Sequence, residues 1–323
     1  MPDGSQTGLL ELRLRSVTWE AEDINSYEFV AVAGLLPAFE AGSHLDLHLP
    51  DGLVRSYSLL NDPRDRERYV VAVHNDPNSR GGSRQVHKTL RVGAILRASA
   101  PRNTFPLHED APHSVLIAGG IGITPLLCMV ERLAALGRPW RLHYATSTRA
   151  RCAFRPHLEH LAGDNPGRLH IVHDGEPGGE RLDLPALVAA APADAHLYCC
   201  GPAPMLAAFG QAAASRPATH VHVEHFAARE EAATDGGYAV VLGRSRRRVP
   251  VAPGQTMLAA LLNAGASVNY SCSEGICGTC ETRVLSGVPD HRDNFLTDDE
   301  RAANATVMVC CSGSKTPELI LDL

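Results

Sequence analysis

Residues 272–280 read CSEGICGTC, and two further cysteines, Cys310 and Cys311, follow later in the chain. Deprotonated cysteine thiols are the ligands that soft metals and iron–sulfur clusters prefer, and a short loop can present several of them to one centre. Gly275 and Gly278 allow the loop backbone to fold closely around that centre. The predicted ligands are Cys272, Cys277, Cys280 and one cysteine of the later pair.

The spacing of these cysteines distinguishes between the possible kinds of centre. A C-x4-C-x2-C run with a distant fourth cysteine is typical of plant-type [2Fe–2S] sites. Structural zinc sites are usually built from paired C-x2-C units, and the gap between Cys272 and Cys277 fits them poorly. A [2Fe–2S] cluster is therefore favoured over a zinc site or a set of unrelated buried cysteines.

The remaining cysteines have other expected places. Cys310 and Cys311 are expected on one strand, where successive side chains point to opposite faces, so a rigid cluster can use only one of them. Strand geometry does not choose between the two. Cys128, Cys152 and Cys199 are expected as small apolar residues of the core.

Composition and charge limit the function of the chain. Its 323 residues are enough for two or three domains that each bury a core. The formal net charge of −6 argues against nucleic acid as a partner, because phosphate binding needs a basic face. We find no signal-peptide run and no stretch near the about 18 apolar residues of a membrane span. We therefore expect a cytoplasmic monomer without membrane attachment.

The first hundred residues have the pattern of an antiparallel β-barrel. Short runs of alternating apolar residues are separated by turns rich in Gly, Pro, Asn and Asp. The strands predicted from these runs are 10–17, 27–32, 44–49, 56–60 and 69–74. One helix, 83–90, interrupts them. Short strands at such close spacing predict a barrel.

Two short motifs of this barrel form a candidate flavin site. An arginine near a helix N-terminus that is preceded by glycines makes a phosphate site. Tyr57 offers an aromatic face to a flavin ring, and Ser58 offers a hydroxyl near a ring nitrogen. Taken alone, the motif at 55–58 is better explained as an ordinary strand. The candidate residues are Arg55, Ser56, Tyr57, Ser58, Gly81, Gly82 and Ser83.

Beyond Pro112 the pattern changes to that of a doubly wound α/β domain. Residues 115–118 form a continuous apolar run, which is typical of a parallel strand covered on both faces. A helix is predicted over 125–136. Further strands are predicted at 141–145, 169–173 and 196–200, in alternation with helical stretches. This βαβ alternation predicts a doubly wound parallel sheet.

Two turns of this domain form a candidate nicotinamide site. The sequence GGIGITP at 119–125 opens a helix whose free N–H groups can bind a pyrophosphate, with Pro125 expected at the first helical position. The sequence CGP at 200–202 also joins a strand to a helix, although a plain turn explains it equally well. Both turns are expected at the carboxyl ends of parallel strands, where such sheets bind ligands. The candidate residues are Gly119, Gly120, Gly122, Thr124, Pro125, Cys200, Gly201 and Pro202.

The polar stretch 227–237 indicates a linker, and a second β-rich unit, 238–323, follows it. Within that unit, Thr297 and Glu300 predict the capping box of a short helix. Its acidic residues are candidates for a docking face toward a basic partner, although they equally fit a solvated surface. These residues are Glu274, Asp290, Asp293, Asp298 and Asp299.

Together these motifs resemble the ferredoxin–NADP⁺ reductase superfamily over nearly the whole chain. The order of flavin barrel, nicotinamide domain and C-terminal plant-type ferredoxin resembles the phthalate dioxygenase reductase family, which includes vanillate O-demethylase reductases. The strings at 81–83, 101–105 and 223–226 also resemble that family. The resemblance implies an FMN-binding β-barrel over 1–109, an NAD-binding α/β domain over 110–226, a linker over 227–237 and a β-grasp ferredoxin domain over 238–323.

The same resemblance implies the cofactors and several roles. It implies FMN rather than FAD, because the family lacks an adenosine-binding segment, and it selects Cys310 as the fourth cluster ligand. It implies NADH rather than NADPH, although Arg149 and Arg151 leave that choice open. Phe226 aligns with the aromatic residue that covers the flavin where the nicotinamide arrives. The catalytic residues that it implies are Ser58, Thr124, Cys200 and Phe226.

The function implied by the resemblance is that of the reductase component of a multicomponent oxygenase. NADH gives hydride to FMN, and single electrons leave through the [2Fe–2S] cluster to a terminal oxygenase of the Rieske or haem type. The alternative enzyme is a general NAD(P)H reductase or diaphorase that serves oxygen, quinone or another soluble acceptor. A redox sensor is a third hypothesis, which the intact motifs at 55–58 and 119–125 disfavour.

Overall fold

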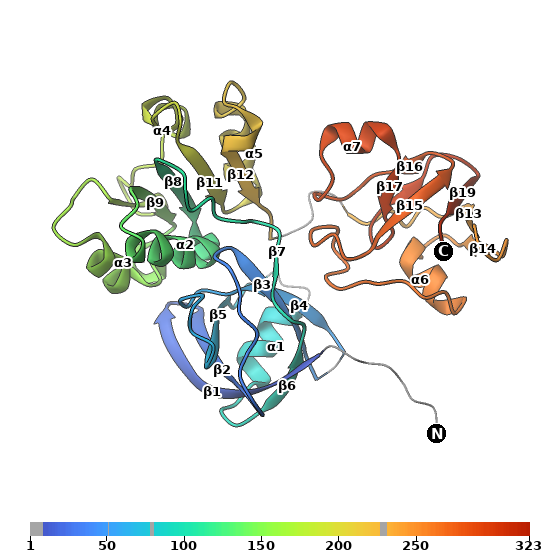
Figure 1. Ribbon diagram of the computed structural model, residues 1–323, viewed down its shortest axis with the longest axis horizontal. Coiled ribbons are helices and arrows are strands. Elements are labelled where there is room, and N and C mark those ends of the chain that lie inside the picture. Colours follow the sequence, from blue (N-terminus) through green and yellow to red (C-terminus); the bar gives the residue numbers. More distant parts are fainter. Residues whose placement is uncertain (1–8, 51, 78–80, 227–230) are drawn as a thin grey trace. The chain divides into compact units, whose positions relative to one another are not determined.

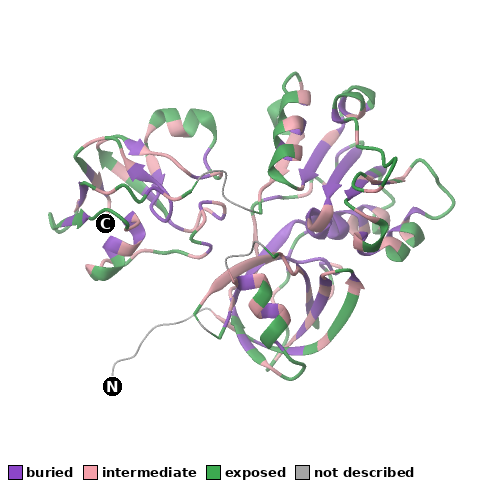
Figure 2. Cartoon of the chain, turned by 180° about the vertical axis from the view of Figure 1, so that it is seen from behind, coloured by how far each residue is buried: buried purple, intermediate pink, exposed green. Residues whose placement is uncertain are grey.

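The computed structural model describes residues 9–50, 52–77, 81–226 and 231–323. By its contacts the chain divides into two compact units, Met1–Glu224 and His225–Leu323. Figure 1 shows the elements of each unit, and Figure 2 shows that the strands carry much of the buried surface. Among the described residues, we find no helix with the length and apolar character needed to cross a membrane.

The first part of unit 1 is an antiparallel sheet. Its described strands are β1 (Leu10–Ala21), β2 (Ile24–Ala31), β3 (Ser43–His48), β4 (Val54–Ser58), β5 (Arg68–His74), β6 (Ile95–Ala98) and β7 (Arg102–Asn103). They pair in the order β4-β3-β6-β1-β2-β5, with β7 on β3. The two ends of this order meet, because Leu60 N–H donates to Val70 O of β5 at 3.0 Å. The predicted barrel is confirmed, with one helix, α1 (Gly82–Thr89), between β5 and β6.

Alternation along the strands explains why this sheet closes around a core. Leu12 and Leu14 of β1 are fully buried, whereas Arg13 between them is exposed. Phe29 of β2 lies directly opposite Tyr69 of β5, and both are fully buried. Such cross-strand pairs on one face stabilise both the pairing and the core.

The second part of unit 1 is a parallel sheet in the order β10-β9-β8-β11-β12 among the described strands. The strands are β8 (Ser114–Gly119), β9 (Trp140–Thr146), β10 (Leu169–His173), β11 (His196–Cys200) and β12 (Val221–Glu224). The helices are α2 (Ile123–Ala135), α3 (Arg155–Ala162), α4 (Leu184–Ala190) and α5 (Ala203–Ala212), with 3-10 turns η1 (Gly120–Gly122), η2 (Arg149–Arg151) and η3 (Ala218–His220). Every residue of the central strand β8 is buried, as expected of a parallel strand covered on both faces. The predicted doubly wound domain is therefore confirmed.

The helix after β8 begins earlier than the sequence predicts. The chain leaves Gly119 through η1, and α2 starts at Ile123, so Pro125 is its third residue and not its first. The first four N–H groups of a helix have no acceptor within the helix. Proline at the third position therefore removes no helical hydrogen bond. For this reason the position of Pro125 does not define the first residue of α2 to within one turn.

The barrel and the parallel sheet pack against each other within unit 1. The Cys128 thiol of α2 donates to Asn61 O next to β4 at 3.3 Å. The Phe105 ring meets the Tyr198 ring of β11 edge-on, with centroids 5.9 Å apart. Because these buried contacts join the two parts, unit 1 holds the candidate flavin and nicotinamide residues on one packed body.

Unit 2 is built on a mixed sheet with the described order β14-β13-β19-β15-β17. Its elements are β13 (Tyr238–Leu242), β14 (Arg248–Val251), α6 (Met257–Asn263), β15 (Glu281–Ser286), β16 (Pro289–Asp290), α7 (Asp298–Ala303), β17 (Thr306–Met308), β18 (Gly313–Ser314) and β19 (Glu318–Leu321). Strands β13 and β19 are parallel, and α6 buries Met257 and Leu261 in the core of the unit. This is the predicted β-grasp arrangement. The predicted capping box is also confirmed, because Thr297 and Glu300 bond each other's backbone N–H.

The predicted linker, 227–237, is only partly described, since residues 227–230 lie outside the described residues. The remainder belongs to unit 2. Ala233 N–H donates to Cys311 O at 2.7 Å, and Gly254 N–H donates to Thr234 O at 2.7 Å. Residues 231–237 are thus anchored to unit 2 and do not form a free connection.

Candidate functional site

The predicted cluster ligands come together in unit 2. Cys272, Cys277 and Cys280 lie in the loop between α6 and β15, and Cys310 lies in the turn after β17. All four are buried. The thiol of Cys272 contacts those of Cys277 and Cys310, and Cys280 contacts Cys310. These thiol contacts lower the pKa of Cys272 and of Cys280 and raise the pKa of their partners Cys277 and Cys310, so the four thiols titrate as one group.

Two glycines of the ligand loop are required by its backbone. Gly275 and Gly278 have φ values of 71° and 72°, in the left-handed region that disfavours other residues. A Cβ on Gly275 would lie 2.5 Å from Cys311 Sγ, and one on Gly278 would lie 2.3 Å from the Phe295 ring. The loop also supports its first ligand directly, because Glu274 N–H donates to Cys272 Sγ at 3.3 Å. Such backbone donors tune the reduction potential of an iron–sulfur cluster.

The expectation that Cys310 and Cys311 lie on a strand with opposite faces is wrong. Strand β17 ends at Met308, and both cysteines lie in the turn that follows, in which Ser312 N–H bonds Met308 O at 3.0 Å. The alternation of a strand does not apply to a turn, so the two thiols contact each other. They differ in their other partners. Cys310 contacts the thiols of Cys272 and Cys280, whereas Cys311 bonds Met308 O at 3.8 Å and approaches Ser312.

The predicted phosphate residues of the barrel also come together. The Arg55 side chain covers Gly82, where an added Cβ would lie 2.6 Å from Arg55 Nε. No side chain caps the N-terminus of α1 among the described residues, and Gly81 before it has φ 98°. The Ser83 Oγ is buried without a hydrogen-bond partner in the described part of the chain. A cation, free helical N–H groups and an unused hydroxyl thus meet at one point.

The other residues of the 55–58 motif lie on β4. Tyr57 is half-buried and pairs with Leu45 of β3, while Ser58 is buried at the end of the strand. The Ser56 hydroxyl donates to the buried Asp46 carboxylate at 2.6 Å. It therefore holds β4 to β3, and its hydroxyl is already used within the barrel.

The two candidate nicotinamide turns lie against each other at the carboxyl edge of the parallel sheet. Strands β8 and β11 pair in parallel, with Ala118 opposite Cys200. A Cβ on Gly122 would lie 2.2 Å from Cys200 O, and one on Gly119 would lie 2.6 Å from Pro202. The glycines are therefore needed for the two turns to approach. A Cβ on Gly201 would likewise lie 3.1 Å from the Gly119 backbone, whereas Gly120 is distinguished by its left-handed φ of 53°.

Cys200 and Glu224 form a pair of acids at this edge, with Cys200 fully buried and Glu224 half-buried with its Oε2 enclosed. They are opposite each other where β11 and β12 end. Burial raises the pKa of Glu224 to about 8, and burial, reinforced by Glu224, raises the pKa of Cys200 well above its ordinary value. Both groups are therefore protonated at pH 7. Glu224 was not predicted as a site residue. Its place at the end of a short strand gives no sequence signal of its own, although the string 223–226 contains it.

Three other predicted residues have specific surroundings. Thr124 is buried, and its hydroxyl donates to Ile121 O at 3.0 Å across the first turn of the helix. Phe226 follows β12 and is 38% exposed. Arg151 of η2 pairs with Asp23 at 3.0 Å, and the N–H of Arg149 donates to Glu176 at 2.7 Å.

The prediction that Asp293 belongs to an acidic docking face is wrong. Asp293 is buried, and its carboxylate accepts the N–H groups of Phe295 and Leu296 at 3.1 and 2.8 Å. It organises the segment before α7, so it is not part of a surface. Asp290 pairs with Arg292 at 2.8 Å, whereas Asp298 and Asp299 are exposed.

Comparison with known proteins agrees with this organisation. Residues 240–314 match the 2Fe-2S iron-sulfur cluster binding domain, and residues 116–211 match the oxidoreductase NAD-binding domain. The "Phenoxybenzoate dioxygenase subunit beta" of Ectopseudomonas oleovorans is 53% identical over 97% of both chains. The "Tetrachlorobenzoquinone reductase" of Sphingobium chlorophenolicum is 48% identical over 97% of this chain and 98% of its own length.

One solved structure matches this chain over nearly its whole length. Phthalate dioxygenase reductase, described as "a modular structure for electron transfer from pyridine nucleotides to [2Fe-2S]", superposes with a TM-score of 0.76. It is 38% identical and matches 98% of each chain. The chain therefore belongs to the phthalate dioxygenase reductase family, whose members are NADH-dependent oxidoreductases that serve as reductase components of multicomponent oxygenases.

Proposed function

We propose that this chain oxidises NADH on a flavin held by unit 1 and delivers single electrons through a [2Fe–2S] cluster in unit 2 to a terminal oxygenase. The observation that carries the proposal is the coexistence of two built sites. One is the pair of turns at Gly122 and Cys200, and the other is the group of four buried thiols. A flavin, when bound, converts two-electron hydride chemistry into one-electron transfer.

The flavin site has the donors that suit FMN. Arg55, the N–H groups at the start of α1 and the Ser83 hydroxyl would hold the phosphate. Tyr57 would cover a face of the ring, and Ser58 would place a hydroxyl near a ring nitrogen. Gly81 and Gly82 permit this approach, whereas Ser56 supports the strand from behind through Asp46.

The nicotinamide site is assembled by the two turns. Backbone N–H groups of Gly119, Gly120, Gly122 and the following turn would bind the pyrophosphate, with Thr124 and Pro125 fixing the first turn of α2. Cys200, followed by Gly201 and Pro202, would contact the nicotinamide ring, and Phe226 would cover the flavin face until the nicotinamide arrives. Glu224 joins this set, because a protonated carboxyl can donate a hydrogen bond without adding charge beside a transferring hydride.

Two observations favour NADH over NADPH. A 2′-phosphate needs an arginine that is available to it. Arg151 is instead engaged by Asp23 at 3.0 Å and Glu22 at 3.7 Å. The carboxylate of Glu176 lies 2.7 Å from the Arg149 N–H, where it would repel a second phosphate.

The cluster ligands proposed are Cys272, Cys277, Cys280 and Cys310. The contacts of Cys310 with the thiols of both Cys272 and Cys280 support its selection over Cys311. Asp298 and Asp299 remain as a candidate docking face toward a basic oxygenase. None of the nine cysteines, each described, forms a disulfide, which supports a reducing compartment such as the cytoplasm, and the protein is expected to work as a monomer. Light scattering on the purified protein tests the monomer.

The composition of the purified holoprotein tests the proposal. Acid release should yield one FMN per chain, and metal analysis should yield two irons. NADH should reduce ferricyanide and cytochrome c, and it should support turnover of a partner terminal oxygenase. FAD or zinc in their place would contradict the assignment.

A second candidate function is the direct reduction of quinones. The 48% identity to a tetrachlorobenzoquinone reductase favours it. The two functions are distinguished by whether the quinone or the terminal oxygenase is reduced with the higher kcat/KM. Turnover with 1,4-benzoquinone that exceeds turnover with the oxygenase would select the quinone reductase.

A further inference from the structure

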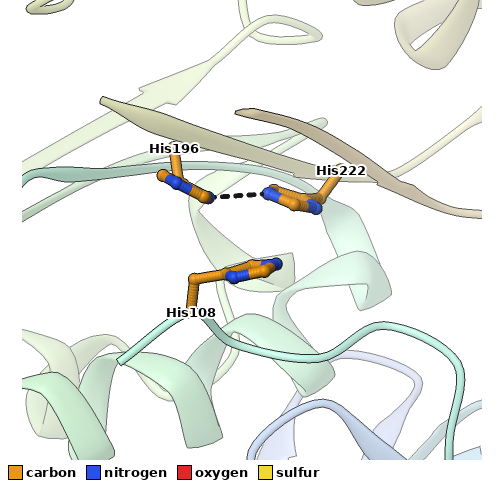
Figure 3. A group of neighbouring side chains, drawn as sticks. All are labelled: His108, His196 and His222. Atoms are coloured by element: carbon orange, nitrogen blue, oxygen red, sulfur yellow. Dashed lines mark hydrogen bonds between the residues drawn. The ribbon is translucent and has the colours of Figure 1, made fainter. Parts of the chain in front are cut away.

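Three histidines that belong to neither candidate site gather at the amino ends of strands β11 and β12 of the parallel sheet. His196 begins β11, His222 lies near the start of β12, and His108 lies in the segment between β7 and β8. Figure 3 shows the three rings facing one another. Along β11, Cys200 lies four residues after His196, about 13 Å at the usual rise of a strand, and along β12 Glu224 lies two residues after His222, about 7 Å. The histidine cluster is therefore separate from the candidate nicotinamide site.

The nitrogen atoms of this cluster have the spacing of a metal site. His196 Nδ1 and His222 Nε2 are 3.0 Å apart, and one ligand atom of each of the three residues lies within 4.8 Å of the others. Two imidazole nitrogens on a tetrahedral zinc ion lie about 3.3 Å apart, given Zn–N bonds of about 2.0–2.1 Å. Two ligands thus have the required separation already, and only the third must move closer.

His108 is the residue that can make this movement. It is exposed and lies in a loop, whereas His196 and His222 are half-buried on strands. Its ring stacks over theirs with centroids 4.6 and 4.9 Å away. Rotation about its side-chain bonds would turn a ring nitrogen toward the other two, at little cost for an exposed side chain.

A hydrogen bond joins His196 Nδ1 and His222 Nε2, and the His222 ring stacks on the Tyr198 ring with centroids 4.5 Å apart. Within the described part of the chain, however, none of the three rings is paired with a carboxylate, so ion pairing does not hold them together. A fourth histidine, His220 of η3, lies 4.5 Å from the His196 ring, and its Nδ1 is buried without a hydrogen-bond partner among the described residues. An imidazole nitrogen that is buried and unsatisfied costs free energy unless a ligand engages it.

We propose that His108, His196 and His222 bind a divalent transition-metal cation, with zinc as the first candidate. Neutral imidazoles suit zinc, nickel and copper, whereas magnesium and calcium prefer oxygen ligands. Three histidines leave the fourth tetrahedral position for water or His220. The bound cation joins the segment before β8 to β11 and β12, so it stabilises unit 1 rather than taking part in electron transfer.

The test is a calorimetric titration of Zn²⁺ into untagged holoprotein at pH 7.5, where histidines are mostly neutral. Wild-type protein should bind one Zn²⁺ per chain at this site. His108→Ala should weaken the binding at least tenfold, and His222→Ala should weaken it further. The absorbance of the iron–sulfur cluster is followed throughout, so that zinc exchange at the cysteines is recognised.

The matched control is His170→Ala. His143 and His170 lie on β9 and β10 of the same sheet with Nδ1 atoms 3.5 Å apart, but no described third ligand joins them. This variant should bind Zn²⁺ as the wild type does. Zinc should also raise the Tm of wild type and of His170→Ala, but not that of His108→Ala.

Two results would overturn the proposal. One is the absence of stoichiometric Zn²⁺ binding to the wild type, and the other is equal affinity in His108→Ala and the wild type. Because His108 is exposed, its replacement leaves folding intact even if the half-buried His222 proves necessary for it. NADH-driven ferricyanide reduction should be the same in all variants without zinc, since none of these histidines lies at the candidate nicotinamide edge.

Discussion

Cys310 and Cys311 show how much a single position matters in this protein. They are neighbours in a turn, and their thiols contact each other, yet only Cys310 also contacts Cys272 and Cys280. Cys311 instead fills the space beside Gly275, where no additional Cβ fits. One cysteine is positioned to bind the cluster and the other to pack the loop that surrounds it.

Serine substitutions separate these two roles. Cys310→Ser should lose or severely weaken the cluster, because an alkoxide is a poor substitute for a soft thiolate. Cys311→Ser should retain the visible iron–sulfur absorbance and lose about 1–3 kcal/mol of stability, because a hydroxyl replaces a thiol in a packed site. Flavin content and ferricyanide reduction should survive both changes. Loss of the iron–sulfur absorbance in Cys311→Ser but not in Cys310→Ser would make Cys311 the ligand in place of Cys310.

Glu224 gives the second prediction at the residue scale. Burial raises its pKa from 4.5 to about 8, so between these values the folded state binds a proton that the unfolded state releases. Its stabilising contribution is therefore complete below about pH 4.5 and is lost as the pH rises through 8. We expect NADH-driven ferricyanide reduction to fall above pH 8, as the carboxyl ionises beside the nicotinamide site.

Glu224→Gln tests this prediction, because an amide keeps the shape but cannot ionise. The free energy of unfolding should become less dependent on pH between 4.5 and about 8, and the turnover rate should become less dependent on pH between 7 and 9. Thermal melts and pH–rate profiles of the two proteins measure the change. A profile for Glu224→Gln with the same fall above pH 8 would assign the titration to another group.

At the scale of elements, helix α1 and strand β4 are joined by a single close contact. The Arg55 side chain rests on Gly82, the first residue of α1. Gly82 does not need a left-handed backbone, so its importance lies in the space that it leaves. The contact brings a guanidinium to the free N–H groups of the helix, which is how the fold makes the candidate phosphate site.

Gly82→Ala should disturb this site with little effect on folding. The added Cβ would approach Arg55 Nε to 2.6 Å, so the guanidinium must move away from the phosphate position. We expect FMN affinity to fall at least tenfold, or about 1.4 kcal/mol, measured by fluorescence quenching on the flavin-free protein.

The matched control is Gly210→Ala in α5, where an added Cβ meets no atom within 4 Å. It should leave FMN affinity unchanged and raise stability slightly, because alanine is the better helix former. Equal FMN affinity in Gly82→Ala and Gly210→Ala would show that Arg55 does not bind the FMN phosphate.

At the scale of the molecule, the chain is two separately packed units with different redox tasks. The buried residues of unit 2 form a core of their own, without members from unit 1 among the described residues. Residues 231–237 are anchored to unit 2, and unit 1 ends at Glu224. A cut within 227–230 should therefore leave both cores intact.

A protein of residues 1–226 tests the division of labour. It should fold, bind FMN and reduce ferricyanide with NADH at a rate close to that of the full chain, because residues 1–226 include both candidate sites. It should fail to support the oxygenase, because the cluster in unit 2 supplies the one-electron exit. Normal oxygenase turnover by the truncated protein would show that the flavin donates directly.

Local pattern explains why much of this molecule follows from its sequence. The cysteine spacing at 272–280, the strands at 169–173 and 196–200, and the capping box at Thr297 all depend on residues close together in the chain. Propensity and periodicity act over that range. The start of α2 and the turn at Cys310 differ from the prediction, because N–H groups at helix ends and cysteines in turns produce no periodic pattern in the sequence.

The sequence by itself determined the three-part order of barrel, nucleotide-binding sheet and iron–sulfur unit, and the motifs from which their sites are made. Only the tertiary structure decided which distant residues share a site. It placed Arg55 on Gly82, paired Glu224 with Cys200, buried Asp293, and gathered His108, His196 and His222. The physical reason is that pairing of strands and packing of cores bring together residues whose separation along the chain carries no signal of their contact.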